Sequence, residues 1–301
     1  MFNGKLLSSG GFPFFAVIQK EEENQMVDFA KALRLVREKA PLVQCITNFV
    51  TVNDCANIIL AAGGSPSMAD DLREAAEAVK DAGALVCNLG AVAMVDSMVS
   101  AGRRANELGV PVVLDPVAAG GTALRRDSSR RLLDEVHFAA IRGNASEIRA
   151  LAGQGSGSSG VDVTELDVIT EENLMESIEV VKALAGRTGS VIAVSGKIDV
   201  ISDGRQTMVL RNGCATMARI TGSGCMLTAM MGAYCGAMPD APFDAACTAM
   251  AAMGVAGEIA EEKRLEKGTG NATFRTDLID AIFNLTETEL LEGVRYEIYQ
   301  G

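Results

Sequence analysis

The chain has 301 residues, 48% of them hydrophobic, and a formal net charge of −12, so it can bury a sizeable core in one large or two small domains. This acidity argues against nucleic acid and anionic membrane surfaces as partners, because both repel a negatively charged protein. The only histidine, His137, lies in a run typical of a buried strand. A Ser-His-Asp or Cys-His mechanism therefore lacks a candidate base.

The seven cysteines include no C-x-x-C pair, which argues against a zinc ribbon. The pattern favours free buried thiols in a reducing, cytoplasmic compartment. No apolar run reaches the roughly 18 residues of a membrane helix. The first 25 residues faintly resemble a signal or transit segment, but the acidic run at 21–23 and the missing cleavage pattern count against that. We expect residues 1–25 to be an N-terminal extension, disordered or non-native, before a start at Met26.

In chain order, apolar residues at helical spacing predict a first helix over residues 26–39. A short strand follows at 41–47. A second helix, capped by Asn53 or Asp54, runs to about Ala62, where Gly63-Gly64 stops it. Asp70-Asp71 opens the next helix. After that, apolar strands at 84–89, 110–115, 138–142 and 190–195 alternate with helices at 95–108, 128–136, 145–152 and 171–188.

Beyond residue 195 the pattern predicts a hairpin, 198–202 with 207–211, around Asp203-Gly204. Helices follow Gly224 and Asp240, reaching about Glu262, and a last helix covers 276–284. The Gly/Ser-rich segment 153–160 is predicted to be a mobile surface loop. Strands that alternate with helices, and are continuously apolar, predict an α/β protein with a mostly parallel sheet covered on both faces. The short connections favour one domain over residues 26–301.

Ligands of such folds bind beyond the carboxyl ends of the strands, so polar residues there are candidate site residues. Asp115 ends an apolar strand ahead of Pro116, and could bind magnesium or cap a helix. Further on, Arg142 ends the next strand and Glu147 falls in the first turn of a helix. These two could reach a nucleotide phosphate and a magnesium ion, although Asn144 and Glu147 also fit a purely structural capping box.

Two more strand ends carry small residues. Ser195 is followed by Gly196, which suits the close approach of a nucleotide but is weak evidence alone. The segment Thr221-Gly222-Ser223-Gly224-Cys225 opens a helix, and its backbone N–H groups could form an anion hole for a phosphoryl group in transfer. The alternative is a glycine-rich helix start with no anion role. No Walker A sequence occurs, and the G-x-G-x-x-G at 155–160 lacks the strand and helix of a dinucleotide site.

Taken together, these segments resemble the ribokinase-like kinases, and most closely the hydroxyethylthiazole kinase family. The resemblance runs from about Met26 to Leu290. It is carried by PLVQCITN (41–48), VNDCAN (52–57), SPSMAD (65–70), LDPV (114–117), IRGN (141–144), TGSGC (221–225) and AAMG (251–254).

The resemblance implies a three-layer α/β/α kinase and a homotrimer with active sites between subunits. It also implies transfer of the ATP γ-phosphoryl group to 4-methyl-5-(2-hydroxyethyl)thiazole in thiamine salvage. Its motifs place the thiazole alcohol at Asn48, Met68 and Gly222, ATP at Arg142 and Ser195, and Mg²⁺ at Asp115 and Glu147. The anion hole would fall at Gly222 and Gly224.

Cys225 falls where the sugar kinases of the superfamily carry a catalytic Asp. A thiol is a poor base unless its pKa is lowered, which the helix N-terminus could do. Phosphoryl transfer through a loose transition state needs little help from a base. We therefore expect Cys225 to lie near the reaction, where it could accept a proton, and not to be a covalent nucleophile.

Two positions depart from the family pattern, because many relatives have His where this chain has Gln44 and Cys214. Either change could alter substrate preference without touching the phosphate machinery. A kinase of another vitamin-like alcohol, an inactive relative that binds nucleotide, and a nicotinamide dehydrogenase stay open as alternatives. The intact Asp115 and Glu147 disfavour the inactive relative, and the misplaced glycine motif disfavours the dehydrogenase.

Overall fold

The apolar segments of the sequence form one nine-stranded sheet in the computed structural model, which describes residues 27–153 and 168–300. The strand order is β2-β1-β3-β4-β5-β6-β7-β8-β9. All pairs from β2 to β6 are parallel, and β6 to β9 pair antiparallel. The predicted mostly parallel sheet is confirmed. The expected extension at 1–25 and residues 154–160 of the Gly/Ser segment lie outside the described residues.

The strands are β1 (Leu42–Ile46), β2 (Ser65–Ser67), β3 (Ala84–Asn88), β4 (Val112–Asp115), β5 (Ala140–Gly143), β6 (Val191–Val194), β7 (Asp199–Ser202), β8 (Gln206–Leu210) and β9 (Tyr296–Gln300). The helices are α1 (Phe29–Lys39), α2 (Val52–Ala62), α3 (Ala75–Ala78), α4 (Val95–Leu108), α5 (Ala123–Glu135), α6 (Ala145–Leu151), α7 (Leu174–Thr188), α8 (Ser223–Ala237), α9 (Pro242–Lys267), α10 (Asn271–Asn284) and α11 (Glu287–Gly293). Short 3₁₀ segments occur at Val79–Asp81, Leu89–Met94 and Ala215–Arg219.

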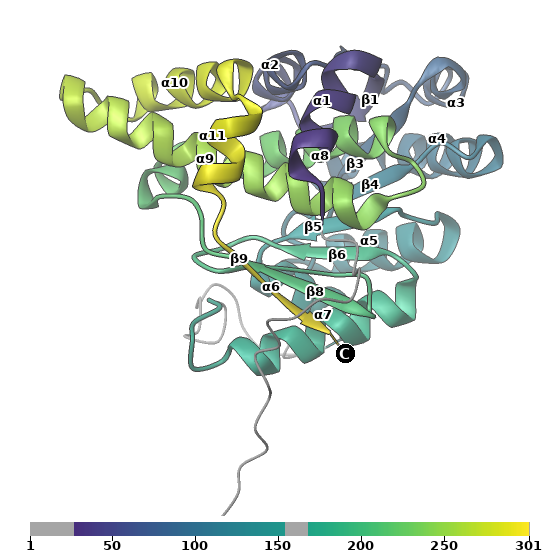
Figure 1. The fold of residues 1–301 in the computed structure, drawn as a ribbon. Helices are drawn as coiled ribbons and strands as arrows, with labels where there is room; N and C mark the ends of the chain where they lie inside the picture. Colours follow the sequence, from purple (N-terminus) through teal and green to yellow (C-terminus); the bar gives the residue numbers. More distant parts are fainter. Residues whose placement is uncertain (1–26, 154–167, 301) are drawn as a thin grey trace, which may run out of the picture.

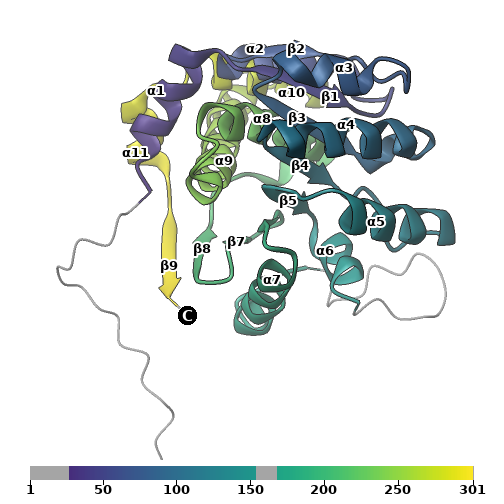
Figure 2. The same ribbon diagram turned by 90° about the vertical axis from the view of Figure 1, so that its right-hand side faces the viewer.

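Helices cover both faces of the sheet, as expected for a three-layer α/β/α protein (Figures 1 and 2). Side chains alternate between faces along each strand. In β4, Val113 joins the core beneath α1, α2, α8 and α9, whereas Val112 and Leu114 join the core beneath α4 to α7. Two apolar clusters, one on each face, therefore hold the sheet, and α8 runs along the first face against β1, β3 and β4.

The ends of several elements differ from the sequence expectation. Helix α2 begins after Thr51, and neither Asn53 nor Asp54 caps it, whereas Gly63 ends it as predicted, in the left-handed region at φ 104°. Helix α5 begins at Ala123 because the Thr122 hydroxyl accepts the Arg125 N–H, which extends it five residues before the predicted start.

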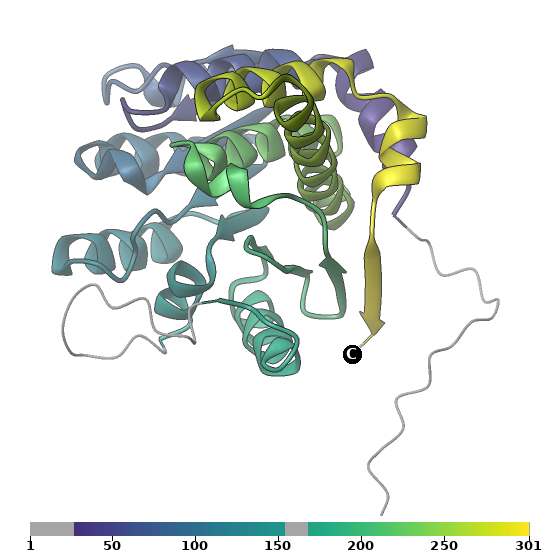
Figure 3. The ribbon, with the colours of Figure 1, turned by 90° about the vertical axis from the view of Figure 1, so that its left-hand side faces the viewer.

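The C-terminal elements α11 and β9 were not predicted. Helix α11 packs against α1, and β9 pairs with β8 at the sheet edge, as Figure 3 shows near the C-terminus. The charged residues of α11 and the half-exposed side chains of β9 give weak hydrophobic patterns. Among the described residues, α9 is long and apolar enough to cross a membrane, but 83% of its apolar window is buried inside the protein, so it is a core helix.

Candidate active site

The parallel strands deliver the candidate residues to one edge of the sheet. Met68 follows β2, Asn48 follows β1, Asn88 ends β3, Asp115 ends β4, Arg142 lies near the end of β5 and Ser195 follows β6. Because side chains alternate, Asn88, Asp115 and Arg142 stand on the face that α8 covers, each two residues after Val86, Val113 or Ala140 of that core. The carboxyl edge thus gathers side chains that are up to 147 positions apart in sequence between Asn48 and Ser195.

Helix α8 starts at this edge with the predicted glycine turn. Gly222 precedes it at φ 83°, in the left-handed region, and a Cβ there would lie 2.5 Å from Cγ2 of Thr51. A Cβ on Gly224 would meet the Arg142 guanidinium. Within the described residues no side chain caps this helix, so the first N–H groups of α8 stay available beside Arg142. Such an uncapped start is suited to bind an anion.

Arg142 lies beneath the glycine turn and is only 8% exposed. Its Nη2 donates to the Ser195 hydroxyl, and its Nη1 lies 4.0 Å from Oδ2 of Asp115. The Nε atom is buried without a hydrogen-bond partner among the described residues. Asp199 accepts the Gly196 N–H at 2.8 Å, which fixes the turn after Ser195. The guanidinium and the hydroxyl predicted for ATP therefore meet in one place.

Asp115 is 1% exposed, and its Oδ2 accepts hydrogen bonds from Asn88 Nδ2 at 2.9 Å and Thr228 Oγ1 at 3.0 Å. Burial is the main cause that raises the pKa of its carboxyl to about 6; Arg142 opposes this shift, and the Glu147 charge contributes to it. When a second carboxylate acts on a buried carboxylate, as Glu147 does on Asp115, a cation stabilises the ionised form.

The Cys225 thiol receives two amide donors, Nδ2 of Asn88 at 3.2 Å and Nδ2 of Asn48 at 3.5 Å. Its pKa is raised, first by burial and then by the Asp115 charge, although these amides oppose the shift. This shift is opposite in direction to the lowering that a helix N-terminus could give, because desolvation and a neighbouring carboxylate raise the pKa. Cys225 is a neutral thiol at pH 7.

Glu147 forms the capping box that the sequence left open as a structural alternative. Its Oε2 accepts the Asn144 N–H at 2.8 Å, and its Oε1 accepts the Ala118 N–H at 2.9 Å. These bonds hold the carboxylate and leave lone pairs for water or a cation. No group of three or more His, Cys, Asp or Glu side chains within residues 27–153 and 168–300 could hold a metal. Two carboxylates suit Mg²⁺ that completes its shell with phosphate and water.

The residues predicted to hold the alcohol lie at the outer strands. Asn48 is 9% exposed and accepts the Val50 N–H at 3.1 Å. Met68 is half-buried against the same core as Cys225. Gln44, fully buried on β1, donates to Ala69 O at 2.8 Å and Ala75 O at 3.1 Å, so it ties the segment after Met68 to the sheet.

Cys214, the other departure from the family, lies after β8 and donates to Gly257 O at 3.4 Å. It is part of the packing between this segment and α9. Asn88, by contrast, was missed by the sequence analysis although it contacts Asn48, Asp115 and Cys225. A polar side chain at the end of the apolar run ALVCN was the signal that could have found it.

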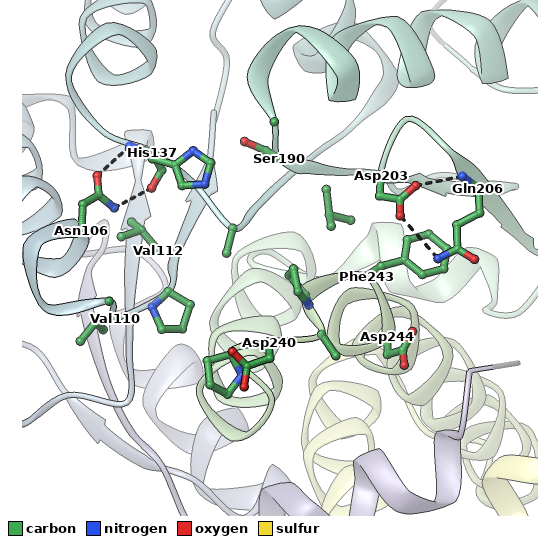
Figure 4. A pocket seen from close by; sticks show the side chains of 18 residues that line it. Asn106, Val110, Val112, His137, Ser190, Asp203, Gln206, Asp240, Phe243 and Asp244 are labelled. Atoms are coloured by element: carbon green, nitrogen blue, oxygen red, sulfur yellow. Dashed lines mark hydrogen bonds between the residues drawn. The ribbon is translucent and has the colours of Figure 1, made fainter. Parts of the chain in front are cut away.

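A hollow of about 520 Å³ lies at the opposite, amino edge of the sheet (Figure 4). Asn106 pairs with the backbone of His137 on one side, and Asp203 pairs with Gln206 on the other. The exposed His137 stands before β5 and not in a buried strand as expected. None of the predicted site residues lines this hollow.

The sheet order, the glycine turn before α8, Asp115 at the end of β4 and Glu147 in the first turn of α6 are typical of a small-molecule kinase of the ribokinase-like fold. Pyridoxal kinase of Bacillus subtilis, solved as an ADP complex, shares this fold with a TM-score of 0.51 at 16% identity, covering 71% of this chain and 90% of that one.

The chain belongs to the hydroxyethylthiazole kinase family, whose model matches residues 33–288. Hydroxyethylthiazole kinases of Desulfovibrio desulfuricans and Clostridium beijerinckii are 48% and 47% identical to it. These matches cover 89% and 86% of this chain and 95% and 93% of the relatives. The solved hydroxyethylthiazole kinase protein from Pyrococcus horikoshii is 34% identical, with a TM-score of 0.79, and covers 91% of this chain and all of that one.

Proposed function

We propose that this kinase transfers the γ-phosphoryl group of ATP to the hydroxyl of 4-methyl-5-(2-hydroxyethyl)thiazole. The observation that carries the proposal is the uncapped start of α8, which directs N–H groups toward the edge that holds Arg142 and Asp115. Backbone donors at fixed positions stabilise the charge that develops on a phosphoryl group in transfer. Membership of the family supplies the choice of alcohol.

In this proposal the site residues have distinct tasks, and Gly222 serves both the phosphoryl group and the alcohol. The amides at Gly222 and Gly224 hold the transferring phosphoryl group, and Arg142 with Ser195 binds the phosphates of ATP. Asn48, Met68 and Gly222 place the alcohol. Asp115 and Glu147 hold Mg²⁺, which neutralises phosphate charge when it is bound.

The alcohol oxygen forms a bond to the γ-phosphorus while the bond to the bridging oxygen of ADP breaks. The hydroxyl proton leaves to solvent as the new bond forms. Because the Cys225 thiol is neutral, it does not remove this proton before bond formation begins. Positioning and charge stabilisation therefore supply most of the rate.

We also propose that the enzyme is a cytoplasmic homotrimer with its sites between subunits. Beside Asn48, Phe49 is 91% exposed and Val50 is 57% exposed in the single chain. Apolar side chains at the rim of a site are typical of a surface that another chain covers. Light scattering on the purified protein should give three times the mass of the chain. A monomer that is fully active would contradict this part of the proposal.

The decisive experiment incubates the purified protein with MgATP and the thiazole alcohol, and follows ADP formation and the mass of the phosphorylated product. Pyridoxal, a sugar and the unphosphorylatable thiazole without its hydroxyl group serve as comparison substrates. We expect the thiazole alcohol to give the highest kcat/KM. A higher kcat/KM for another alcohol would favour the alternative, a kinase of a different vitamin-like alcohol. The observation that favours this alternative is Gln44, which stands where many relatives have His and which binds the segment after Met68.

A further inference from the structure

Asn88 is the residue that joins the parts of the candidate site, although it was not predicted from the sequence. We infer that Asn88 is a positioning residue of this kinase, whose amide fixes the Asp115 carboxylate and the Cys225 sulfur around the transferring phosphoryl group. It ends β3 and is 1% exposed. Its registered neighbour on β4 is Asp115, so the two side chains start from adjacent positions on the same face. The inference rests on the proposed function, because it assigns a role within the same site.

The orientation of the Asn88 side chain is fixed by its neighbours. The Gly90 N–H can only donate, and it lies 2.8 Å from Oδ1, which identifies that atom as the oxygen. The opposite atom, Nδ2, faces Oδ2 of Asp115 at 2.9 Å, and a carboxylate accepts. Exchanging the oxygen and the nitrogen would set two acceptors against each other at one end and two donors at the other. The amide therefore has one acceptable orientation.

Asn88 has no hydrogen-bonding capacity left for a substrate. A carboxamide offers two N–H groups and two oxygen lone pairs. The N–H groups go to Asp115 and to the Cys225 sulfur, and the lone pairs take the Gly90 N–H and Nδ2 of Asn48 at 3.2 Å. A fully used, buried amide acts through its neighbours and does not bind the reactants directly. This is why Asn88 is a positioning residue and not a ligand.

The bond to Asp115 controls which carboxylate oxygen is used. Asn88 and Thr228 both donate to Oδ2, on the side of the carboxylate that also faces Arg142. A carboxylate held by two donors on one oxygen presents its other oxygen in a fixed direction. Mutation of a group that orients a metal-binding carboxylate typically lowers metal affinity or activity about 10- to 100-fold.

The bond to Cys225 fixes the sulfur at the head of α8. Asn88 and Asn48 both donate to it, so the sulfur is the acceptor of two amides that come from the ends of β3 and β1. The glycine turn is thereby tied to three neighbouring strands, β1, β3 and β4. Small errors in this alignment displace the anion-binding amides from the phosphoryl group, which lowers the rate of an aligned reaction steeply.

Gly90 shows independently that the space around the Asn88 oxygen is filled. A Cβ on Gly90 would lie 2.6 Å from Asn88 Oδ1 and 2.9 Å from Asn48 Nδ2. A methyl group there cannot be accommodated unless the amides move. The turn after β3 is therefore closed tightly over the network.

The experiment tests the N–H donors of the Asn88 amide separately from its oxygen acceptor. Asn88→Asp keeps an oxygen for Gly90 and Asn48 but loses the donors to Asp115 and Cys225, whereas Asn88→Ala loses all four bonds. If Asn88 serves only the fold, both variants lose stability, because Asn88→Asp also sets a second buried carboxylate against Asp115, but the folded protein keeps the wild-type kcat. If the donors position the site, both variants lose about 10- to 100-fold in kcat. The KM for MgATP should rise only in step with the loss of metal affinity, because Arg142 and Ser195 are untouched.

A second readout does not depend on turnover. The affinity of the enzyme for Mn²⁺ in the presence of ATP, measured by electron paramagnetic resonance without any alcohol, should fall about tenfold or more in Asn88→Ala. Asn284→Asp, at the exposed end of α10, is the matched control and should keep wild-type values. Wild-type kcat and Mn²⁺ affinity in both Asn88 variants would overturn the inference.

Two controls keep the result decisive. If the Asn88 variants fail to fold, Gly90→Ala displaces the same amide from outside, and wild-type turnover in that variant would overturn the inference. If the wild-type enzyme phosphorylates none of the alcohols, the proposed function fails, while the Mn²⁺ measurement still tests the role of Asn88 directly.

Discussion

The two edges of the sheet both bring carboxylates together, but they differ in what surrounds them. At the amino edge, Asp203, Asp240 and Asp244 line an open hollow whose described lining residues include no Lys or Arg. Helices α4 and α7 end there, at Gly109 and Gly189, so the negative ends of their dipoles face it. At the carboxyl edge, α8 begins, and Arg142 lies beneath its first turn.

The comparison teaches that space and carboxylates alone do not make a phosphate site. Helix α9 also begins at this hollow, at Pro242, but three carboxylates line it and no guanidinium lies among its described lining residues, so a nucleotide phosphate is repelled there. It is attracted by an uncapped helix start beside a guanidinium. The hollow of about 520 Å³ is therefore at the wrong edge for the chemistry, and substitutions of matched residues at the two edges test this contrast.

The largest effect should come from Gly222→Ala. Gly222 has a φ of 83°, and the added Cβ would lie 2.5 Å from Cγ2 of Thr51. The turn must therefore move, and its backbone N–H groups would no longer point toward the phosphoryl group. We expect turnover to fall by about 10²-fold or more, the size of losing an oxyanion-hole donor. Gly189→Ala is the matched control at the amino edge, because its φ is 68° and the nearest atom, on His137, is 3.7 Å away.

Gly189→Ala should lower stability by about 1 kcal/mol through its left-handed backbone and leave kcat unchanged. Circular dichroism confirms that both variants fold, and steady-state assays compare their rates. Equal turnover in the two variants would show that the glycine turn at the carboxyl edge has no special function.

The next effect concerns magnesium. Glu147→Gln removes the charge and can keep the capping-box bond from Asn144, because Gln serves at the same helix position, although its NH2 group then faces the Ala118 N–H. We expect the Mg²⁺ concentration for half-maximal activity to rise about 10- to 100-fold, with much of the rate recovered at high Mg²⁺. Asp240→Asn, at the amino-edge hollow, provides the comparison. Identical Mg²⁺ titrations for all three proteins would refute the assignment of Glu147.

The fold and much of this site could be predicted because the apolar strands carry their own signal. The apolar strands β3, β4, β5 and β6 alternate with helices along the chain, and this pattern predicted the parallel sheet. The glycine turn predicted the start of α8. Asn88 was missed because its role depends on pairing between β3 and β4. Once that register is known, a polar residue at the strand end necessarily stands beside Asp115.

The remaining misses have similar causes. The C-terminal strand β9 pairs only at an exposed edge, so its residues need little hydrophobicity. The raised pKa of Cys225 follows from burial and from Asp115, which is 110 positions away in sequence, and no local pattern encodes that neighbour. The structural role of Gln44 likewise depends on the Ala69 and Ala75 carbonyl groups that it binds, which no local sequence pattern identifies.

The stability of the fold should depend on pH through Asp199, at the start of β7. Burial raises the pKa of Asp199 to about 7 from its ordinary 3.8, although the Gly196 N–H and Arg142 oppose the shift. The folded protein therefore prefers the protonated form. This contribution to stability is complete below about pH 4 and is lost as the pH rises through 7.

Compared with Asp199→Asn, the wild type should lose about 1 kcal/mol of unfolding free energy per pH unit between pH 5 and 7. Asn can still accept the Gly196 N–H but does not ionise. Asp203→Asn, in the turn at the other end of β7, is the comparison variant, because it removes a carboxylate without touching the Gly196 bond. Urea titrations at several pH values measure this. Parallel curves for the wild type and Asp199→Asn would refute the assignment.

The smallest effect should be that of Cys225→Ser. The thiol is neutral, and its sulfur accepts amide bonds from Asn88 and Asn48, which a serine hydroxyl can also accept. Turnover should therefore fall only a few-fold, on the order of the loss of one weak contact near the reacting atoms. Cys235→Ser, buried in the same helix toward the amino edge, should lower stability and leave turnover unchanged. Complete inactivation of Cys225→Ser, together with a phosphorylated wild-type enzyme detected by mass spectrometry, would require a covalent role for the thiol. A few-fold loss without such a species would leave the amides of α8, and not its cysteine, as the main source of the rate.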